Sequence, residues 1–416
     1  MKKLICLLLA ALLLMSALPT LALGETKELR VWLPPFGTEE TLDKEFWDAQ
    51  FDKFEAEHDV TIDVSIISWD NYPDKYMAGI SSGSGPDVGY MYADMFPDFI
   101  EMGAVQDLAP YLTDADRAVY PYLEEGFILG AQYAVPFILG NPRVIYYNKA
   151  VLADAGVEAP TEPITWDEFV DICKACTKDT DGDGAIDQWG TMMCWGAKTY
   201  GALQQNFTPF LLQAGGQLFA DDGKTATFGS EAGIKAGKFV HDLVYEYNVM
   251  STDCTAMEDA DCAALFNDNK IAFYFAATAQ ASQLTCDWGY IPCLKDEYAL
   301  TMMVADQLVL MADCRDNDLG MELIRFMCSA DVQAAFHTTL SAFPPINTEE
   351  PYNDNPAFEE LYTEHADMLR TEKPVKSAYK IDEYLWKNMQ MVMMDEMTPE
   401  DALPEAQDYA NSVFAE

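Results

Sequence analysis

The first quarter of the chain alternates between strand and helix patterns in a way that few folds accommodate. Residues 29–33 and 87–91 are short apolar runs, and 60–67 alternates apolar and polar side chains, as strands do. Helical patterns separate them at 41–57, where apolar residues gather on one side, and at 72–80. This order predicts an α/β fold with a parallel sheet covered by helices on both faces. The pattern resumes later, with helices expected near 166–177, 201–214, 230–247 and 382–397.

Residues 133–169 contain more signals of local structure than any other stretch of the sequence. Tyr-Ala-Val-Pro at 133–136 leads to Tyr-Tyr-Asn-Lys at 146–149, which predicts an extended segment, a crossing loop and a strand that ends in a small helix. Gly156 is expected to stop that helix, and Thr165 to cap the next one. Because the block has no nucleophile–base pair, phosphate loop or metal-ligand spacing, it indicates scaffold and not a catalytic centre.

The N-terminal residues 1–24 have the pattern of a secretory signal peptide, with two lysines, an apolar run and a small-residue cleavage site. The apolar run is shorter than the ~20 residues that a membrane-spanning helix needs. Cys6 lies too early to be a lipidated cysteine after cleavage. We therefore expect an exported protein, periplasmic or extracellular, without a lipid anchor.

The charge of the chain limits its partners. It has 69 acidic and 25 basic residues, and its net charge is −44. No basic stripe is available for phosphate contacts, so nucleic acid is not expected as a partner. The acidity also disfavours anionic membranes and anionic substrates, and it is compatible with a neutral or a cationic ligand.

No pattern in the sequence indicates an enzyme. Residues 79–83 match the G-x-S-x-G pattern of hydrolases, but a helix is expected before the serine and a strand after it, the reverse of a nucleophile elbow. The four histidines are isolated, so a zinc ligand set is not visible. We expect no catalytic residues and no cofactor required for function.

One acidic loop has the spacing of a metal site. Its oxygen-bearing residues follow the front half of an EF-hand loop, although position 12 is glycine where the EF-hand has a bidentate glutamate. A solvated Asp/Gly turn is the alternative to a structural calcium ion. The candidate calcium ligands are Asp179, Asp181, Asp183, Ala185 and Asp187.

Nine cysteines follow the signal segment, an odd number for an exported chain. Cys173 and Cys176 lie three residues apart toward the end of an expected helix. A thioredoxin-type pair needs the helix N-terminus to lower the pKa of a thiol, so buried, unreactive thiols are favoured here.

Six segments of the chain resemble, in the same order, those of the family 1 extracellular solute-binding proteins of ABC transporters. This group includes the maltodextrin- and multiple-sugar-binding proteins. The resemblance covers nearly the whole chain after the signal segment. The segments are 82–88 (SGSGPDV), 102–108 (MGAVQDL), the 133–169 block, 215–219 (GGQLF), 266–272 (FNDNKIA) and 398–403 (TPEDAL).

The resemblance implies the two-lobed periplasmic-binding-protein fold of type II. Each lobe would be a mostly parallel sheet flanked by helices, with the ligand cleft between the lobes. Because the chain crosses between lobes more than once in this fold, each lobe is discontinuous. The N-terminal lobe is expected at 25–138 plus 291–338, and the C-terminal lobe at 139–290 plus 339–416.

The cleft residues are sought in loops that follow strands, where open α/β sheets bind ligands. Aromatic faces stack on sugar rings, and carboxylates, amides and arginine bind sugar hydroxyls. In relatives, an acid after the third strand contacts the sugar, and it maps to Asp94. An aromatic residue of the maltodextrin binders is Ala279 here, which argues against maltodextrin. The candidate ligand-binding residues are Phe36, Gly37, Trp69, Tyr92, Asp94, Asn141, Arg143, Trp195, Tyr200, Asn206, Thr278, Gln280, Asp306, Tyr384 and Trp386.

The resemblance predicts an extracytoplasmic receptor of an ABC importer. It would capture a neutral carbohydrate, an oligosaccharide by preference, through lobe closure, and would deliver it as a monomer to membrane permease subunits. Two alternatives stay open. One is a receptor of the same fold for a polyamine or another cation, and the other is a secreted carbohydrate-active hydrolase.

Overall fold

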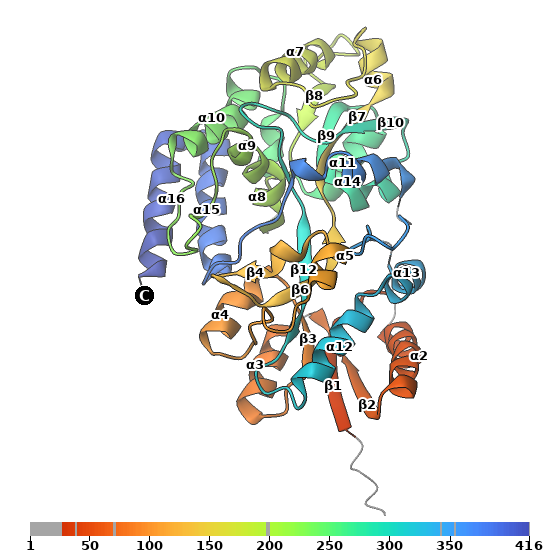
Figure 1. Cartoon of the computed structure of the whole chain (residues 1–416). Helices are drawn as coiled ribbons and strands as arrows, with labels where there is room; N and C mark the ends of the chain where they lie inside the picture. Colours follow the sequence, from red (N-terminus) through yellow and green to blue (C-terminus); the bar gives the residue numbers. More distant parts are fainter. Residues whose placement is uncertain are drawn as a thin grey trace, which may run out of the picture.

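The computed structural model of the chain describes residues 27–37, 40–69, 72–196, 200–341, 343–352 and 355–415. The chain forms two lobes, each built around one β-sheet, and it passes between them several times (Figure 1). The predicted signal peptide, residues 1–24, lies outside the described residues. Within them, no helix has the length and apolarity to cross a membrane.

The first lobe, lower in Figure 1, contains a five-stranded sheet in the order β2-β1-β3-β12-β6. Its strands are β1 (Lys27–Leu33), β2 (Val60–Ile66), β3 (Val88–Met91), β6 (Ala134–Gly140) and β12 (Val304–Leu310). Its helices are α2 (Glu40–Glu57), α3 (Tyr72–Ser82), α4 (Phe96–Glu101), α5 (Asp114–Val119), α12 (Asn317–Met327) and α13 (Ala330–Thr339). A hairpin of β4 (Phe127–Ile128) and β5 (Ala131–Gln132) projects from it. The strand–helix alternation predicted for this region is confirmed, and Gly83, at φ 68°, follows the end of α3.

The second lobe contains a four-stranded sheet in the order β10-β7-β9-β8. Its strands are β7 (Arg143–Asn148), β8 (Trp189–Met192), β9 (Ile271–Ala277) and β10 (Trp288–Ile291). Its helices are α6 (Lys149–Asp154), α7 (Trp166–Cys176), α8 (Tyr200–Asn206), α9 (Thr208–Gln213), α10 (Glu231–Tyr245), α11 (Asp259–Asn267), α14 (Glu359–Thr363), α15 (Ala378–Met393) and α16 (Pro399–Phe414). Thr165 caps α7 as expected, in a capping box with Glu168.

Both sheets are mixed, whereas the resemblance implied mostly parallel ones. β1 pairs in parallel with β2 and β3, and β8 with β9, while β12 and β7 run antiparallel to their neighbours. The reason lies in the crossings. β12 and β7 each enter their sheet directly from the other lobe, so they start at the edge where the remaining strands end.

Two expected helices differ from those observed. The helix predicted at 201–214 is divided into α8 and α9 at Phe207, which has non-helical dihedrals, and Pro209 lies in the first turn of the restarted helix. The helix predicted at 382–397 ends at Met393, because Asp395 adopts a left-handed conformation. Thr398 then caps α16, a helix that the sequence pattern did not predict.

Aromatic packing anchors the core of the first lobe beneath the cleft. Phe137 of β6 stacks on Phe336 of α13 with ring centroids 5.4 Å apart, and Trp47 of α2 lies 5.7 Å from Phe336. Phe36, in the loop after β1, contacts the same Phe336 at 5.2 Å. This contact fixes the loop that opens toward the second lobe.

The chain crosses between the lobes through short segments. Between β6 and β7, Gly140 and Asn141 have φ of 152° and 46° and turn the chain within two residues. β11 (Thr301–Met302) lies between β10 and β12 and pairs in parallel with β13 (Leu369–Arg370). After α13, residues 347–350 still contact the first lobe, and Phe358 then packs on the second. The lobe boundaries given above stay predictions.

Candidate functional site

Strand ends of both sheets converge between the lobes, and they are carboxyl ends except for those of β7 and β12, which begin there. The register places Gly140, the last residue of β6, opposite Val304, the first residue of β12. In the second lobe, Ala277 at the end of β9 pairs with Arg143 at the start of β7. Because ligands of open α/β sheets bind at the carboxyl ends of strands, the region between the lobes is the candidate site.

An aromatic cluster lines the first-lobe side. The ring centroid of Trp69 lies 6.5 Å from Phe36, 5.9 Å from Tyr90 and 6.3 Å from Tyr92. Trp69 Nε1 donates to Pro35 O at 3.0 Å, which orients the indole, and 44% of the residue is exposed. The structure thus brings three sequence candidates together around an accessible tryptophan face.

Asp43 fixes the loop that carries Phe36 and Gly37. The amides of both residues donate to its carboxylate, at 2.7 Å from Phe36 N and 3.0 Å from Gly37 N. A Cβ on Gly37 would lie 3.1 Å from Asp43 Oδ2, so the close approach favours glycine. Asp43 is a supporting residue that the sequence analysis did not identify.

Two carboxylates lie next to the aromatic cluster. Tyr90 of β3 donates its hydroxyl proton to Asp306 Oδ2 of β12 at 2.5 Å. Burial raises the pKa of Asp306 to about 6, the Tyr90 bond opposes that shift, and the negative charge of Asp94 adds to it. Burial likewise raises the pKa of Asp94. The pKa of Tyr92 is raised by burial and by the charges of Asp94 and Asp306.

At the first crossing, between β6 and β7, a chain of hydrogen bonds joins the crossing to helix α8 and to Glu372. Arg143 donates from Nη1 to Asn141 O at 2.7 Å and from Nη2 to Gln204 Oε1 at 3.1 Å. Gln204 Nε2 in turn donates to Glu372 Oε2 at 2.9 Å. Thr278, buried, joins this crossing through its amide, which donates to Pro142 O at 3.0 Å. Three predicted residues therefore meet at the crossing.

Helix α15 supplies the second-lobe side. Asp382 is 3% exposed, and its Oδ2 has no hydrogen-bond partner. Burial raises its pKa well above the ordinary value, and the charges of Glu372 and Asp94 raise it further. The predicted Trp386 follows one helical turn later, half-buried, with its Nε1 unpaired.

Several candidates do not lie where the sequence analysis placed them. Trp195 is fully buried in the core, and its carbonyl accepts from Gln390 Nε2 of α15. Asn206 is also fully buried and donates to Cys194 O at 2.9 Å. Tyr384 is turned toward α16, where it stacks on Tyr409 at 3.9 Å between centroids and donates to Glu405 at 3.0 Å. Core packing and helix pairing take up these side chains.

The last two candidates lie at the start of α8 and in the turn after β9. Tyr200 begins α8, and its side chain lies outside the described residues. Gln280 is half-buried in the 3₁₀ turn after β9.

Sequence reasoning missed Asp382, Glu372, Gln204 and Tyr90. A usable signal existed for Asp382, because it precedes Trp386 by four residues and so shares its helix face. Glu372 lies in a segment without strand or helix pattern, and only the fold brings it beside Gln204.

Two cavities open along the segment 370–374. One of about 470 Å³ is lined by the β4–β5 hairpin, by Asp221 and Gly223, and by this segment. Another of about 300 Å³ is lined by residues of α9 and the 216–219 loop, together with the same segment. None of the sequence candidates lines either cavity, so these walls extend the candidate site beyond the predicted residues.

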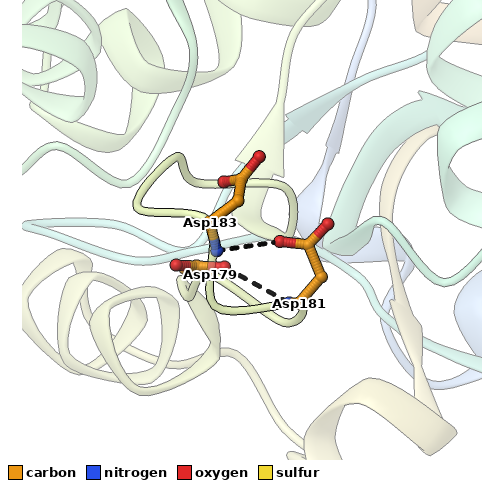
Figure 2. A group of neighbouring side chains, drawn as sticks. All are labelled: Asp179, Asp181 and Asp183. Carbon is orange, nitrogen blue, oxygen red and sulfur yellow. Dashed lines mark hydrogen bonds between the residues drawn. The ribbon is translucent and has the colours of Figure 1, made fainter.

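The predicted metal loop lies apart from the cleft, before β8 at the far end of its sheet. The carboxylates of Asp179, Asp181 and Asp183 offer oxygens within 4.8 Å of one another, and Figure 2 shows them around one turn. Asp179 accepts from the amides of Gly182 and Gly184 at 2.6 and 2.7 Å, which lowers its pKa. This donor set fits a hard cation.

The other two predicted ligands are arranged differently. Asp187 accepts from the amide and hydroxyl of Thr180 and lies 3.7 Å from Lys270 Nζ, so its carboxylate is engaged outside the three-aspartate group. The amide of Ala185 donates to Asp183 Oδ1 at 2.8 Å.

Comparison with known proteins identifies relatives over most of the chain. The model of the family "bacterial extracellular solute-binding protein" matches residues 37–334. A binding protein of Brucella abortus is 22% identical over 334 residues, which span 76% of this chain and 74% of the relative. The arabinooligosaccharide-binding protein of Halalkalibacterium halodurans is 23% identical over 221 residues, 47% of this chain and 45% of the relative.

Solved structures share the fold. The cyclic alpha-maltosyl-1,6-maltose binding protein of Arthrobacter globiformis superimposes with a TM-score of 0.74 at 19% identity, covering 93% of this chain and 98% of that one. At this identity the likeness supports the two-lobed fold.

Proposed function

Because the chain belongs to the bacterial extracellular solute-binding protein family, we propose that it is an extracytoplasmic receptor that delivers an oligosaccharide to an ABC importer. The observation that carries this proposal is the aromatic cluster at the strand ends of the first lobe, with a carboxylate bonded to one of its members. Trp69 and Tyr92 offer ring faces, and Asp306 offers a carboxylate that is bonded to Tyr90 of the same cluster. Sugar recognition needs both kinds of group.

The relatives support a carbohydrate as the ligand. One of them binds arabino-oligosaccharides, and a protein of the same fold binds a cyclic maltosyl-maltose. Both are saccharides of several units. The cavities along the segment 370–374 offer further room for such a ligand.

Lobe closure provides the transport signal in this proposal. Ligand contacts made by both lobes are complete only in the closed state, so binding shifts the population toward it. Gly140 and Asn141 are the hinge residues, since the chain reverses there between the two sheets. The closed receptor docks on the permease, and the signal segment at 1–24 directs export.

A thermal-shift screen against saccharides, followed by calorimetry, tests this function. A receptor at ~100-fold excess over its dissociation constant gains roughly 2.7 kcal/mol, which raises the melting temperature. Trp69→Ala removes an exposed ring of the cluster and is expected to weaken binding at least tenfold. Tyr298→Ala removes an exposed ring outside the cluster and serves as the matched control.

The same sample separates a receptor from a hydrolase. Carboxylates beside a sugar-binding surface are also compatible with glycoside hydrolysis. Stoichiometric binding with the oligosaccharide recovered intact supports the receptor. Release of shorter products by the purified protein overturns it.

A further inference from the structure

A separate cavity lies in the first lobe, at the end of the sheet away from the cleft. Its volume is about 260 Å³, and it is bordered by the loops that follow α3 and α4 and by the turn that follows β12. β1 and β3 begin near this cavity and run in parallel toward Phe36 and Tyr92, so the cavity and the candidate site lie at opposite edges of one sheet. Pockets for drug-sized ligands begin at roughly 300 Å³, so this cavity suits a smaller molecule.

Arg30 of β1 lines this cavity with a guanidinium group that has no partner. Within the described residues, its Nε is buried without a hydrogen-bond acceptor, and Arg30 takes part in no ion pair, whereas Arg315 and Arg325 each pair with a carboxylate. Asp63 lies opposite Arg30 in the β1–β2 register but is exposed and does not pair with it. Because a charged donor cut off from water without an acceptor is unfavourable, an acceptor that enters the cavity gains a strong partner.

The buried carboxylate of Asp87 adjoins Arg30, but other donors already occupy it. It accepts from the amide of Arg30 at 2.7 Å and from the amide of Arg315 at 2.8 Å, and Arg315 Nη1 lies 3.4 Å from it. The amide of Asp87 in turn donates to the carbonyl of Arg30 at 2.8 Å. These bonds fix the main chain of Arg30 and pair the charge of Asp87 with Arg315, so the guanidinium group of Arg30 stays unpaired.

A negative charge borders the same cavity. Asp313, in the turn after β12, is exposed and, like Arg30, forms no ion pair among the residues that the structure describes. The two opposite charges therefore share one cavity without pairing with each other. A ligand that carries both charges satisfies both side chains, whereas a simple anion places a like charge beside Asp313.

Apolar side chains form much of the remaining wall. Pro86 and Met311 are buried, Ile80 is half-buried, and Met102 is exposed at the rim. The flexible thioether of methionine adapts to apolar groups of varied shape. The cavity thus combines one cation, one anion and an apolar surface.

We propose that this cavity binds a free amino acid with an apolar side chain. At neutral pH such a molecule carries both a carboxylate and an ammonium group. The carboxylate accepts from the planar donors of Arg30, the ammonium group pairs with Asp313, and the side chain packs on Met102 and Met311. Because a zwitterion has no net charge, the net charge of −44 does not oppose its approach. The inference goes beyond the proposed function, since this site is separate from the cleft.

Calorimetry at pH 7 with three matched probes tests the proposal. L-leucine carries both charges, N-acetyl-L-leucine only the negative one, and L-leucinamide only the positive one. L-leucine is expected to bind at one site per chain, and each analogue at least tenfold more weakly. Arg30→Gln is expected to remove the preference over L-leucinamide, and Asp313→Asn the preference over N-acetyl-L-leucine. Arg117→Gln, which removes an exposed guanidinium group on α5, is the control.

Each other outcome overturns the proposal. If L-leucine, L-valine, L-methionine and L-phenylalanine all fail to bind, the cavity is not an amino-acid site. If N-acetyl-L-leucine or acetate binds as tightly as L-leucine, the cavity takes an adventitious anion only. If neither Arg30→Gln nor Asp313→Asn weakens the binding of L-leucine, the amino acid binds elsewhere on the protein.

Saccharide binding by the same samples separates this inference from the proposed function. Both variants are expected to bind saccharide as the wild type does, which also shows that they are folded. Asp313 lies on an exposed turn, so Asp313→Asn keeps the test decisive if Arg30→Gln does not fold. If L-leucine binds in a way that depends on Arg30 and no saccharide binds, the amino-acid site stands and the saccharide receptor falls.

Discussion

The hydroxyl of Tyr90 and the carboxylate of Asp306 share a 2.5 Å hydrogen bond that ties two adjacent strands together at the mouth of the cleft. Tyr90 pairs with Leu308 across the antiparallel β3–β12 ladder, so Asp306, two residues away, lies on the same face. The bond partly offsets the burial of the Asp306 carboxylate. It also holds the ring of Tyr90 against Phe36 at 5.3 Å, which joins the polar and aromatic parts of the site.

Tyr90→Phe is expected to destabilise the protein in a pH-dependent way. The variant leaves a buried carboxylate without its donor, which costs about 1–3 kcal/mol of unfolding free energy at pH 7. At pH 4.5 the loss is expected to be smaller, because the Asp306 carboxyl is then largely protonated and its hydrogen bond is weaker. Urea unfolding at both pH values measures it. Tyr92→Phe, whose hydroxyl forms no hydrogen bond in the described structure, is the control; equal losses at both pH values contradict the argument.

The pKa of Asp306 also predicts how stability changes with pH. Its pKa is about 6 in the folded protein and near 3.8 ordinarily, so the folded state holds a proton that the unfolded state has lost between these values. Stability therefore falls as pH rises through this window, and the penalty is complete above it. Asp306→Asn lacks the penalty. Its stability relative to the wild type is expected to rise by at least about 1 kcal/mol from pH 4 to pH 6 and then to level off. A flat difference from pH 4 to pH 8 argues against this assignment.

The sequence was sufficient for residues whose position follows from a strand end. Asp94 and Tyr92 come directly after β3, where the rule for strand ends predicts ligand contacts, whereas Asp306 lies near the start of β12, the strand that returns from the other lobe. The rule cannot say which face of a helix is turned to the cleft. Tyr384 and Trp386 are two positions apart on α15, and only packing against α16 decides that Tyr384 faces away.

Long-range contacts account for the remaining differences. Glu372 lies beside Gln204 because the last crossing returns the chain to the second lobe, which no local pattern encodes. Trp195 follows a strand as a binding residue would, but its backbone is tied to Cys254 and Gln390, and the ring becomes core. The local sequence pattern shows that an aromatic residue follows a strand, but only the tertiary packing decides whether its ring lies in the core or in the cleft.

The thiols of the chain are expected to be free and inaccessible. No disulfide joins cysteines in the described part of the chain, and Cys173 and Cys176 are buried, as the sequence predicted. Burial raises the pKa of both, so thiolate is scarce at neutral pH. Thiol titration of the mature protein is expected to give nine equivalents after unfolding in denaturant. Fewer than three should react quickly when it is folded, since only Cys286 and Cys314 are half-buried. A count below nine after unfolding reveals an undetected disulfide.

Calcium is expected to bind the loop around Asp181 and to stabilise the second lobe without changing ligand binding in the cleft. Three carboxylates with oxygens within 4.8 Å repel one another, and a divalent cation relieves that repulsion. Calorimetry on chelator-stripped protein is expected to show one site per chain, with a raised melting temperature when calcium is added.

The calcium affinities of two variants show which aspartates coordinate the ion and which only lie beside it. Asp181→Asn removes a carboxylate of the three-residue group and is expected to weaken calcium binding at least tenfold. Asp187→Asn is expected to have a smaller effect, because Thr180 and Lys270 already engage that side chain. If Asp187→Asn is as damaging as Asp181→Asn, then Asp187 turns into the site on binding, as the EF-hand spacing implies. If the stripped wild-type protein shows no calcium heat, the loop is a solvated turn held by its glycine and threonine hydrogen bonds.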